Sequence, residues 1–145
     1  MNMKTLTALL LVMIPTTVLA QGFETEIKAR QNAFSEIETV LGQADDVIDG
    51  SKTGWDELAS LSQTLQEHGH TLTVSFPKGS QDGSKAKDAV WDKSNKFDSL
   101  LSQMNSGFEE MYRASQEQSV SMAENGLKQS ENTCRGCHRT YRSRW

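Results

Sequence analysis

The residues best suited to chemistry stand near the end of the 145-residue chain, at Cys134, Cys137 and His138. They belong to the sequence Cys-Arg-Gly-Cys-His, and the chain has no other cysteine. Cys-x-x-Cys-His is the attachment sequence of a c-type haem, in which both thiols form thioethers with the vinyl groups and the histidine becomes the proximal iron ligand. The spacing therefore predicts one covalently bound haem c, with His138 as the axial ligand of the iron.

Helix geometry explains why this spacing works. On an α-helix that turns about 100° per residue, Cys137 lies about 60° to one side of Cys134 and His138 about 40° to the other. Tyr141 falls between them. All four side chains can therefore face one planar group that lies against the helix.

Two other interpretations of the cysteine pair remain open. A Cys-x-x-Cys pair also occurs as a redox dithiol or disulfide, but such pairs belong near a βαβ pattern, and the sequence shows none. A structural zinc site normally has four ligands, and only His68 and His70 could complete one here. Haem attachment is favoured over both, because it uses the cysteines and the adjacent histidine together.

The first 20 residues have the three parts of an export signal. Lys4 supplies the positive charge, residues 6–14 form a short apolar run, and Ala20 ends a cleavage site. The apolar run is too short to span a bilayer as a helix. We expect a cleavable signal peptide at 1–20, one mature domain at 21–145, no membrane insertion and a location in the bacterial periplasm. In that oxidising compartment, haem attachment would also prevent the two thiols from pairing.

The formal net charge of −4 argues against a nucleic-acid partner, which would require a basic face. A local exception is the C-terminal cluster of Arg135, Arg139, Arg142 and Arg144. Cations are favourable at the C-terminal end of a helix for electrostatic reasons alone. Docking of a partner or of an anionic haem propionate is the alternative explanation.

Four segments show helical periodicity, and none alternates as a strand. The first two span about 24–47 and 53–67, and a loose connection at 68–84 precedes the third. The predicted inward positions are Phe23, Ile27, Arg30, Phe34, Ile37, Leu41, Ala44 and Ile48, then Trp55, Leu58, Leu61 or Ser62, and Leu65, then Val90, Ser94, Phe97, Leu101, Met104, Phe108 and Met111, and finally Val120, Ala123, Leu127, Ser130, Cys134, Cys137 and Tyr141. These stripes predict an all-α, antiparallel four-helix bundle with the haem in its core.

Several of these features also occur together in a known family. The haem sequence lies at the C-terminal end, whereas class I cytochromes c carry it near the N-terminus. Residues 30–34 read Arg-Gln-Asn-Ala-Phe, and the end of the chain reads Cys-x-x-Cys-His-x-x-Tyr-Arg through Arg142. Trp91 and Phe97 have the same spacing as the corresponding residues of that family. In these respects residues 21–145 resemble cytochrome c′, the class II c-type cytochrome family.

The resemblance implies a role for each matching position. Cys134 and Cys137 would hold the haem, and His138 would ligate the iron. Arg142 would border the proximal face, and Arg30 would approach a haem propionate. Independently of the family, an arginine on an apolar stripe needs an anion, because a buried unpaired charge is very costly; a side chain that reaches out to solvent is the alternative. Trp91 and Tyr141 are expected to pack in the core or against the haem edge.

Phe34 is the position with the largest consequence for function. In the family it points at the distal face of the haem, where low-spin members have a methionine ligand and five-coordinate members an apolar residue. Phenylalanine cannot ligate iron, and residues 21–50 contain no Met or His. The remaining mature methionines, Met104, Met111 and Met122, stand at positions that suit core packing. We therefore expect high-spin, five-coordinate iron.

An apolar distal pocket gives little stabilisation to a polar dioxygen adduct, whereas bound nitric oxide and carbon monoxide need less stabilisation by the pocket. We expect a protein that binds these gases and buffers nitric oxide. A one-electron carrier in a respiratory chain is the alternative, and weak peroxidase-like catalysis ranks last because the distal segment lacks a histidine for acid–base chemistry.

His68 and His70 are expected to be solvent-exposed in a loop, with approach to the iron as the alternative. The resemblance further implies a homodimer through the first two helices, and the redox partner is unknown.

Overall fold

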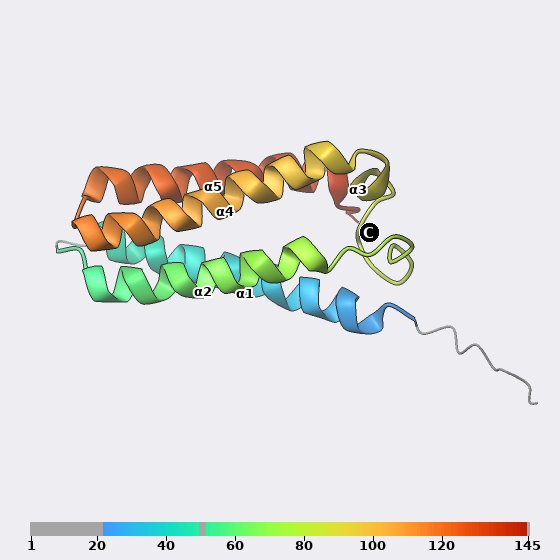
Figure 1. The fold of residues 1–145 in the computed structure, drawn as a ribbon, viewed down its shortest axis with the longest axis horizontal. Helices are drawn as coiled ribbons and strands as arrows, with labels where there is room; N and C mark the ends of the chain where they lie inside the picture. The colour runs from blue at the N-terminus through green and yellow to red at the C-terminus, as the bar shows by residue number, and fades with distance from the viewer. Residues whose placement is uncertain (1–21, 50–51, 145) are drawn as a thin grey trace, which may run out of the picture.

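The structure, a computed structural model, describes residues 22–49 and 52–144. Its helices are α1 (Glu24–Asp49), α2 (Trp55–Val74), α3 (Ala89–Asp92), α4 (Ser94–Glu117) and α5 (Val120–Tyr141). The four long helices lie side by side, and consecutive ones run in opposite directions (Figure 1). The predicted all-α four-helix bundle is confirmed. The predicted signal peptide at 1–20 lies outside the described residues.

The two ends of the bundle differ in character. The end of α1, the start of α2 and the α4–α5 connection lie at one end, and the long connection at 75–88, the short α3 and the end of α5 lie at the other (Figure 1). α1 packs along α2 and α4 along α5, while α1 and α5 approach each other far less extensively. The haem attachment sequence, in the last turns of α5, therefore belongs to the end that contains the long connection.

Most residues of the predicted stripes form the core, whereas Phe23, Ile27, Cys134 and Cys137 are only half-buried. Ser94 and Val120 were expected to face inward, but both are exposed. Each is the first residue of its helix, α4 or α5, so it lies at an end of the bundle. Met104 and Met111 are buried and Met122 is half-buried, as expected for packing residues.

α2 extends further than the sequence suggested. The predicted end was near residue 67, but the helix continues to Val74. Its buried face continues through Gly69 and Leu72. His68 and His70 therefore lie on a helix and not in a loop; His70 is exposed and His68 half-buried. Within the described residues, no three His, Cys, Asp or Glu side chains gather as a metal site.

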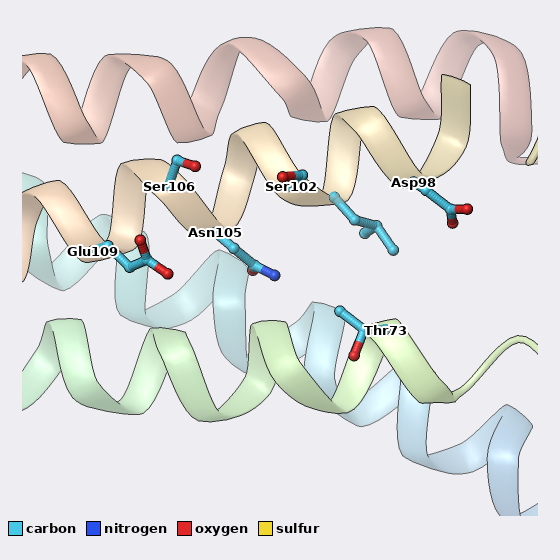
Figure 2. Close-up of a pocket in the computed structure, with 7 residues that line it drawn as sticks. Thr73, Asp98, Ser102, Asn105, Ser106 and Glu109 are labelled. Atoms are coloured by element: carbon cyan, nitrogen blue, oxygen red, sulfur yellow. The ribbon is translucent and has the colours of Figure 1, made fainter. Parts of the chain in front are cut away.

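Gly69 is needed where α2 meets α4. A Cβ atom at Gly69 would lie 3.0 Å from Asn105 Cγ and 3.3 Å from a ring carbon of Phe108. Asn105 extends from α4 toward α2 beside a cavity of about 430 Å³ between these helices (Figure 2). The glycine thus allows a close approach of α2 to α4 despite its low helix propensity.

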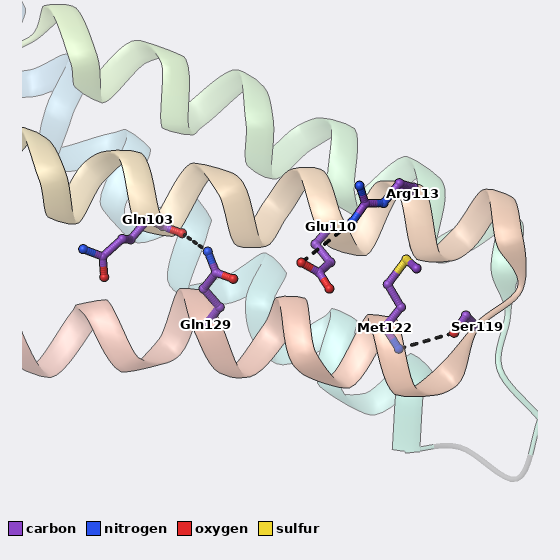
Figure 3. Close-up of polar contacts among 6 residues, drawn as sticks. All are labelled: Gln103, Glu110, Arg113, Ser119, Met122 and Gln129. Atoms are coloured by element: carbon purple, nitrogen blue, oxygen red, sulfur yellow. Dashed lines mark hydrogen bonds and ion pairs between the residues drawn. The ribbon is translucent and has the colours of Figure 1, made fainter.

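Polar contacts fix the α4–α5 hairpin. Gln118 joins the helices with a left-handed φ of 53°, and the Ser119 hydroxyl accepts a hydrogen bond of 3.4 Å from the backbone N–H of Met122. Further along, Gln129 Nε2 donates to the carbonyl of Gln103 at 3.0 Å (Figure 3). Ser119 therefore acts as the N-cap of α5. None of the described helices combines the length and the apolarity needed to cross a membrane.

Candidate haem site

The two cysteines lie half-buried near the C-terminal end of α5, and both are free thiols. The Sγ atom of Cys134 is 3.8 Å from the carbonyl oxygen of Ser130. Burial is the main cause that raises the pKa of Cys134, and the carboxylates of Glu131 on α5 and Glu38 on α1 raise it further.

The pKa of Cys137 is shifted more strongly than that of Cys134. Burial raises its pKa to about 11, and the neighbouring Cys134 adds to the effect. His138, the next residue, is exposed. A Cβ at Gly136 would lie 3.9 Å from a methyl carbon of Leu100, so the attachment segment also contacts α4.

Arg30 on α1 is buried, with only 3% of its surface exposed. Its Nη1 donates to the carbonyl of Ser75 at 3.0 Å and to the hydroxyl of Ser80 at 2.7 Å. Its Nη2 donates to the carbonyl of Ser80 at 2.6 Å and to the hydroxyl of Ser84 at 2.7 Å. The guanidinium also lies 4.7 Å from the ring centroid of Phe76. Arg30 therefore ties α1 to the long connection.

The burial of Arg30 contradicts the alternative of a side chain that reaches out to solvent. Burial is also the main cause that lowers its pKa, and the nearby Glu26 carboxylate opposes this effect. The hydrogen-bond acceptors that it finds in the connection are all neutral oxygens. The approach to a haem propionate stays a prediction.

Four aromatic rings from different segments form a continuous chain at this end of the bundle. Phe34 of α1 contacts Phe76 of the long connection at 6.4 Å between ring centroids. Phe76 contacts Phe97 of α4 at 4.8 Å, and Phe97 contacts Tyr141 of α5 at 5.1 Å. All three contacts are edge-to-face, which is a favourable geometry for aromatic pairs. Two predicted site residues, Phe34 and Tyr141, are thus connected through Phe76 and Phe97.

Trp91 holds the long connection in place. It is half-buried and packs against the core. Its Nε1–H lies 3.1 Å from the carbonyl oxygens of both Phe76 and Pro77. The side chain thus contributes to the core packing that the sequence suggested, and its hydrogen bonds place the backbone of Phe76.

Arg142 follows the last turn of α5 and is exposed. It forms an isolated antiparallel bridge with Ala86 of the long connection. On either side of the bridge, Lys87 N donates to the Tyr141 carbonyl at 2.9 Å and Ser143 N donates to the Lys85 carbonyl at 2.8 Å. The end of α5 is thereby fixed to the same connection that Arg30 holds.

Sequence reasoning missed the contribution of the long connection. Ser75, Ser80 and Ser84 accept the hydrogen bonds of Arg30, and Phe76 completes the aromatic chain. Serines between glycines carry no periodic signal that could assign them a partner. The only available signal was Arg30 itself, since a charge on an apolar stripe requires polar partners.

The donor chemistry fits a covalently attached haem c. Two free thiols lie close together near the end of one helix, a histidine follows directly, and aromatic side chains from three other segments gather at the same end. Fold and site together define a four-helix-bundle protein that carries the c-type haem attachment sequence on its last helix.

A family model described as Cytochrome C' matches residues 25–142, and the chain therefore belongs to the cytochrome c′ family. This family binds haem c and consists of haem proteins that are generally not enzymes. No curated protein matches the chain in sequence.

Solved structures of the family share the fold. Cytochrome c′ from Rubrivivax gelatinosus is 19% identical with a TM-score of 0.76, and the match covers 85% of this chain and 98% of that one. Cytochrome c prime from Shewanella frigidimarina is also 19% identical with a TM-score of 0.76, and the match covers 85% of this chain and 98% of that one. A ferrous variant of cytochrome c prime from Alcaligenes xylosoxidans with bound nitric oxide is 16% identical with a TM-score of 0.77, over 86% of this chain and 98% of that one.

Proposed function

We propose that this chain is a periplasmic haem c protein whose iron binds nitric oxide and carbon monoxide. Cys134 and Cys137 hold one haem through two thioethers, and His138 is its axial ligand. The observation that carries the proposal is the pair of neighbouring, half-buried cysteines near the end of α5, directly followed by His138. The match of residues 25–142 to a haem-binding family supports it.

Phe34 determines which ligands can reach the distal side. The bound haem supplies an iron that can accept a small ligand and carry one electron. Phe34 offers no ligating atom, and residues 22–49 contain neither Met nor His, so no side chain of this segment would occupy the sixth coordination position of the iron. The apolar ring excludes water and offers no hydrogen bond to bound dioxygen, which favours nitric oxide and carbon monoxide. The nitric oxide complex of the Alcaligenes xylosoxidans protein supports this ligand class.

The other parts of the proposal follow from the family and from the sequence pattern. Residues 1–20 direct export to the periplasm, which is also the typical location of the family. There the protein buffers nitric oxide as a homodimer. Arg30 approaches a haem propionate, and Arg142 borders the proximal face. Electron transfer is the second candidate function, and the exposed cations around His138 favour it.

Expression of the full chain in a bacterium that matures c-type cytochromes tests the proposal. We expect a coloured protein with one haem per chain that resists denaturing gels, a high-spin spectrum, and binding of carbon monoxide and nitric oxide after reduction. The Cys134→Ser/Cys137→Ser variant should be colourless, whereas Ser121→Ala at the other end of α5 should keep the haem. A colourless wild type with both thiols free would overturn haem binding, and a low-spin, methionine-ligated spectrum would overturn the open coordination position.

A further inference from the structure

Six exposed cationic side chains surround the end of α5. They come from the long connection and from the last turns of the chain, and we call this surface the basic end. Its residues are Lys85, Lys87, Arg135, Arg139, Arg142 and Arg144. They are six of the fifteen Lys and Arg residues in an otherwise acidic chain. Residues 132–144 contain no Asp or Glu, whereas the long connection also carries the exposed Asp82 and Asp88.

Backbone pairing brings the two segments together. Ala86 lies opposite Arg142 in the antiparallel bridge, so Lys85 and Lys87 flank the residues that follow α5. The Lys87 Nζ atom donates to the carbonyl oxygen of Arg139 at 3.3 Å. Arg135 and Arg139 stand one turn apart on α5, about 40° from each other around the helix axis. The two segments that carry these cations therefore lie together at the end of the bundle that holds the C-terminus (Figure 1).

These charges have no ionic partner in the part of the chain that the structure describes. The one ion pair found there joins Arg113 to Glu110 at 4.0 Å, near the opposite end of the bundle. A helix C-terminus explains cations at Arg135 and Arg139. It does not explain Lys85 and Lys87, which come from another segment and add like charge to the same surface. Such a local field instead attracts and orients an oppositely charged partner.

We propose that the basic end is the docking surface for an acidic protein that exchanges electrons with the haem. The inference rests on the proposed function, because His138 lies between Arg135 and Arg139 in the same turns of α5. The exchange moves one electron between the partner and the iron, with no bond made or broken and no proton transferred. Carbon monoxide binds ferrous and not ferric haem, so its binding would require that the haem first receives an electron.

The basic end is better suited to bind an acidic protein than to bind a lipid surface. Membrane-surface binding combines basic residues with exposed apolar side chains. The large hydrophobic side chains exposed in the described part of the chain are Val74 and Val120. Val120 begins α5 at the opposite end of the bundle, and Val74, the last residue of α2, is a single apolar side chain beside the long connection. An acidic protein surface needs only charge complementarity to steer docking.

Electron-transfer rates with small charged oxidants test the local charge. The reduced protein is mixed with hexacyanoferrate(III), an anion, or with tris(phenanthroline)cobalt(III), a cation; each takes one electron from the ferrous haem. We expect the rate constant for the anion to fall as ionic strength rises from about 10 mM to about 200 mM, because salt screens an attraction. The rate for the cation should rise. The acidic net charge alone predicts the opposite signs.

Charge reversal locates the effect. Lys85→Glu/Lys87→Glu should lower the rate constant for oxidation by hexacyanoferrate(III) about tenfold at low ionic strength. The double variant should also reverse the salt dependence of this rate constant. These residues lie outside the attachment sequence, so the haem stays bound. The matched control Lys52→Glu/Arg113→Glu changes the net charge equally at the opposite end and should leave the rate within about twofold. An equal effect of both variants, or a wild-type rate that rises with salt, would overturn the proposal.

Binding of poly-L-glutamate, followed by NMR chemical shifts, gives a readout that needs no electron transfer. We expect binding to the wild type that the Lys85→Glu/Lys87→Glu variant loses. Sedimentation with phosphatidylglycerol vesicles without binding of poly-L-glutamate would overturn the assignment to an acidic protein in favour of a lipid surface. A colourless wild-type protein would overturn the proposed function, and with it the electron-transfer part, even if poly-L-glutamate still bound.

Discussion

Gly107 on α4 and Gly126 on α5 lie opposite each other with their backbones in close approach. A Cβ atom at Gly107 would lie 2.5 Å from the carbonyl oxygen of Gly126, and one at Gly126 would lie 2.7 Å from the carbonyl oxygen of Gly107. Neither position has room for a methyl group. This pair sets how closely α4 can pack against α5, the helix that carries the attachment sequence.

Replacement of either glycine by alanine should therefore destabilise the bundle. We expect Gly107→Ala and Gly126→Ala each to lower the free energy of unfolding by roughly 2 kcal/mol, because the rigid backbones must move apart. Gly42→Ala is the matched control, since Gly42 is exposed on α1 and a Cβ there meets nothing within 4 Å. It should stabilise by up to about 1 kcal/mol through helix propensity. Urea unfolding measures all three; equal effects would contradict the close approach.

The helical stripes could be predicted from the sequence because they follow a simple period. Ile37, Leu41 and Ala44 on α1 alternate steps of four and three, and all are buried. The end of α2 could not be predicted in the same way. Gly69 was expected in the loose connection at 68–84, yet it lies within α2, and its place there depends on Asn105 and Phe108 of α4, which are neighbours only in the folded state.

The residues of the candidate site show the same difference between local sequence patterns and contacts that form only in the fold. Cys134, Cys137 and His138 were found because their chemistry is encoded in five consecutive residues. The partners of Arg30 were not found, because Ser75, Ser80 and Ser84 lie 45 to 54 positions away in a connection without periodicity. Local patterns predict helices and short motifs, whereas contacts made by an irregular loop depend on the whole fold.

Arg30 should control the order of the long connection. Arg30→Gln loses the charged donors of four hydrogen bonds and leaves buried acceptors of Ser75 and Ser80 without partners, so we expect a loss of about 3 kcal/mol in unfolding free energy. Trypsin should then cleave after Lys78 faster than in the wild type. Lys28→Gln, an exposed position on the same helix, is the control and should change neither value. An unchanged cleavage rate would show that Trp91 holds the connection without Arg30.

Phe34 should limit access of ligands to the iron. Phe34→Ala removes the ring next to Phe76, and we expect carbon monoxide to bind the reduced protein about tenfold faster, because a smaller side chain opens the distal side. Flash photolysis or stopped-flow mixing measures the rate. Phe23→Ala is the control, because Phe23 packs near Gly79 at the start of α1 and should leave binding unchanged. If Phe34→Ala had no effect, another side chain would lie over the iron, and Phe76 would be the first to replace.

The cysteines of the haem-free protein should react slowly with alkylating agents. Burial raises the pKa of Cys137 to about 11, so little thiolate is present at pH 8. We expect iodoacetamide to modify the folded apoprotein at least about tenfold more slowly than the urea-unfolded chain at this pH, since the thiolate is the nucleophile. The rate should climb as the pH approaches 11. Fast modification at pH 8 would show that the thiols are exposed before attachment.

Asn105 offers a test of buried polarity between α2 and α4. Its Oδ1 atom is buried and has no hydrogen-bond partner among the described residues, beside the cavity that Figure 2 shows. An unpaired buried acceptor costs about 1–3 kcal/mol. We therefore expect Asn105→Ala to raise the unfolding free energy by about 1 kcal/mol, with the lost side-chain packing offsetting part of the gain.

Asn105→Asp should act in the opposite direction. A carboxylate at this position would bury a charge without a partner, so the variant should be less stable than the wild type and should recover stability as the pH falls and the group is protonated. Ser106→Ala, an exposed neighbour on the same cavity, is the control and should stay within about 0.5 kcal/mol. Urea unfolding at two pH values measures all of these variants. If Asn105→Ala proved destabilising, Oδ1 would have a partner in solution, such as an ordered water molecule that bridges α2 and α4.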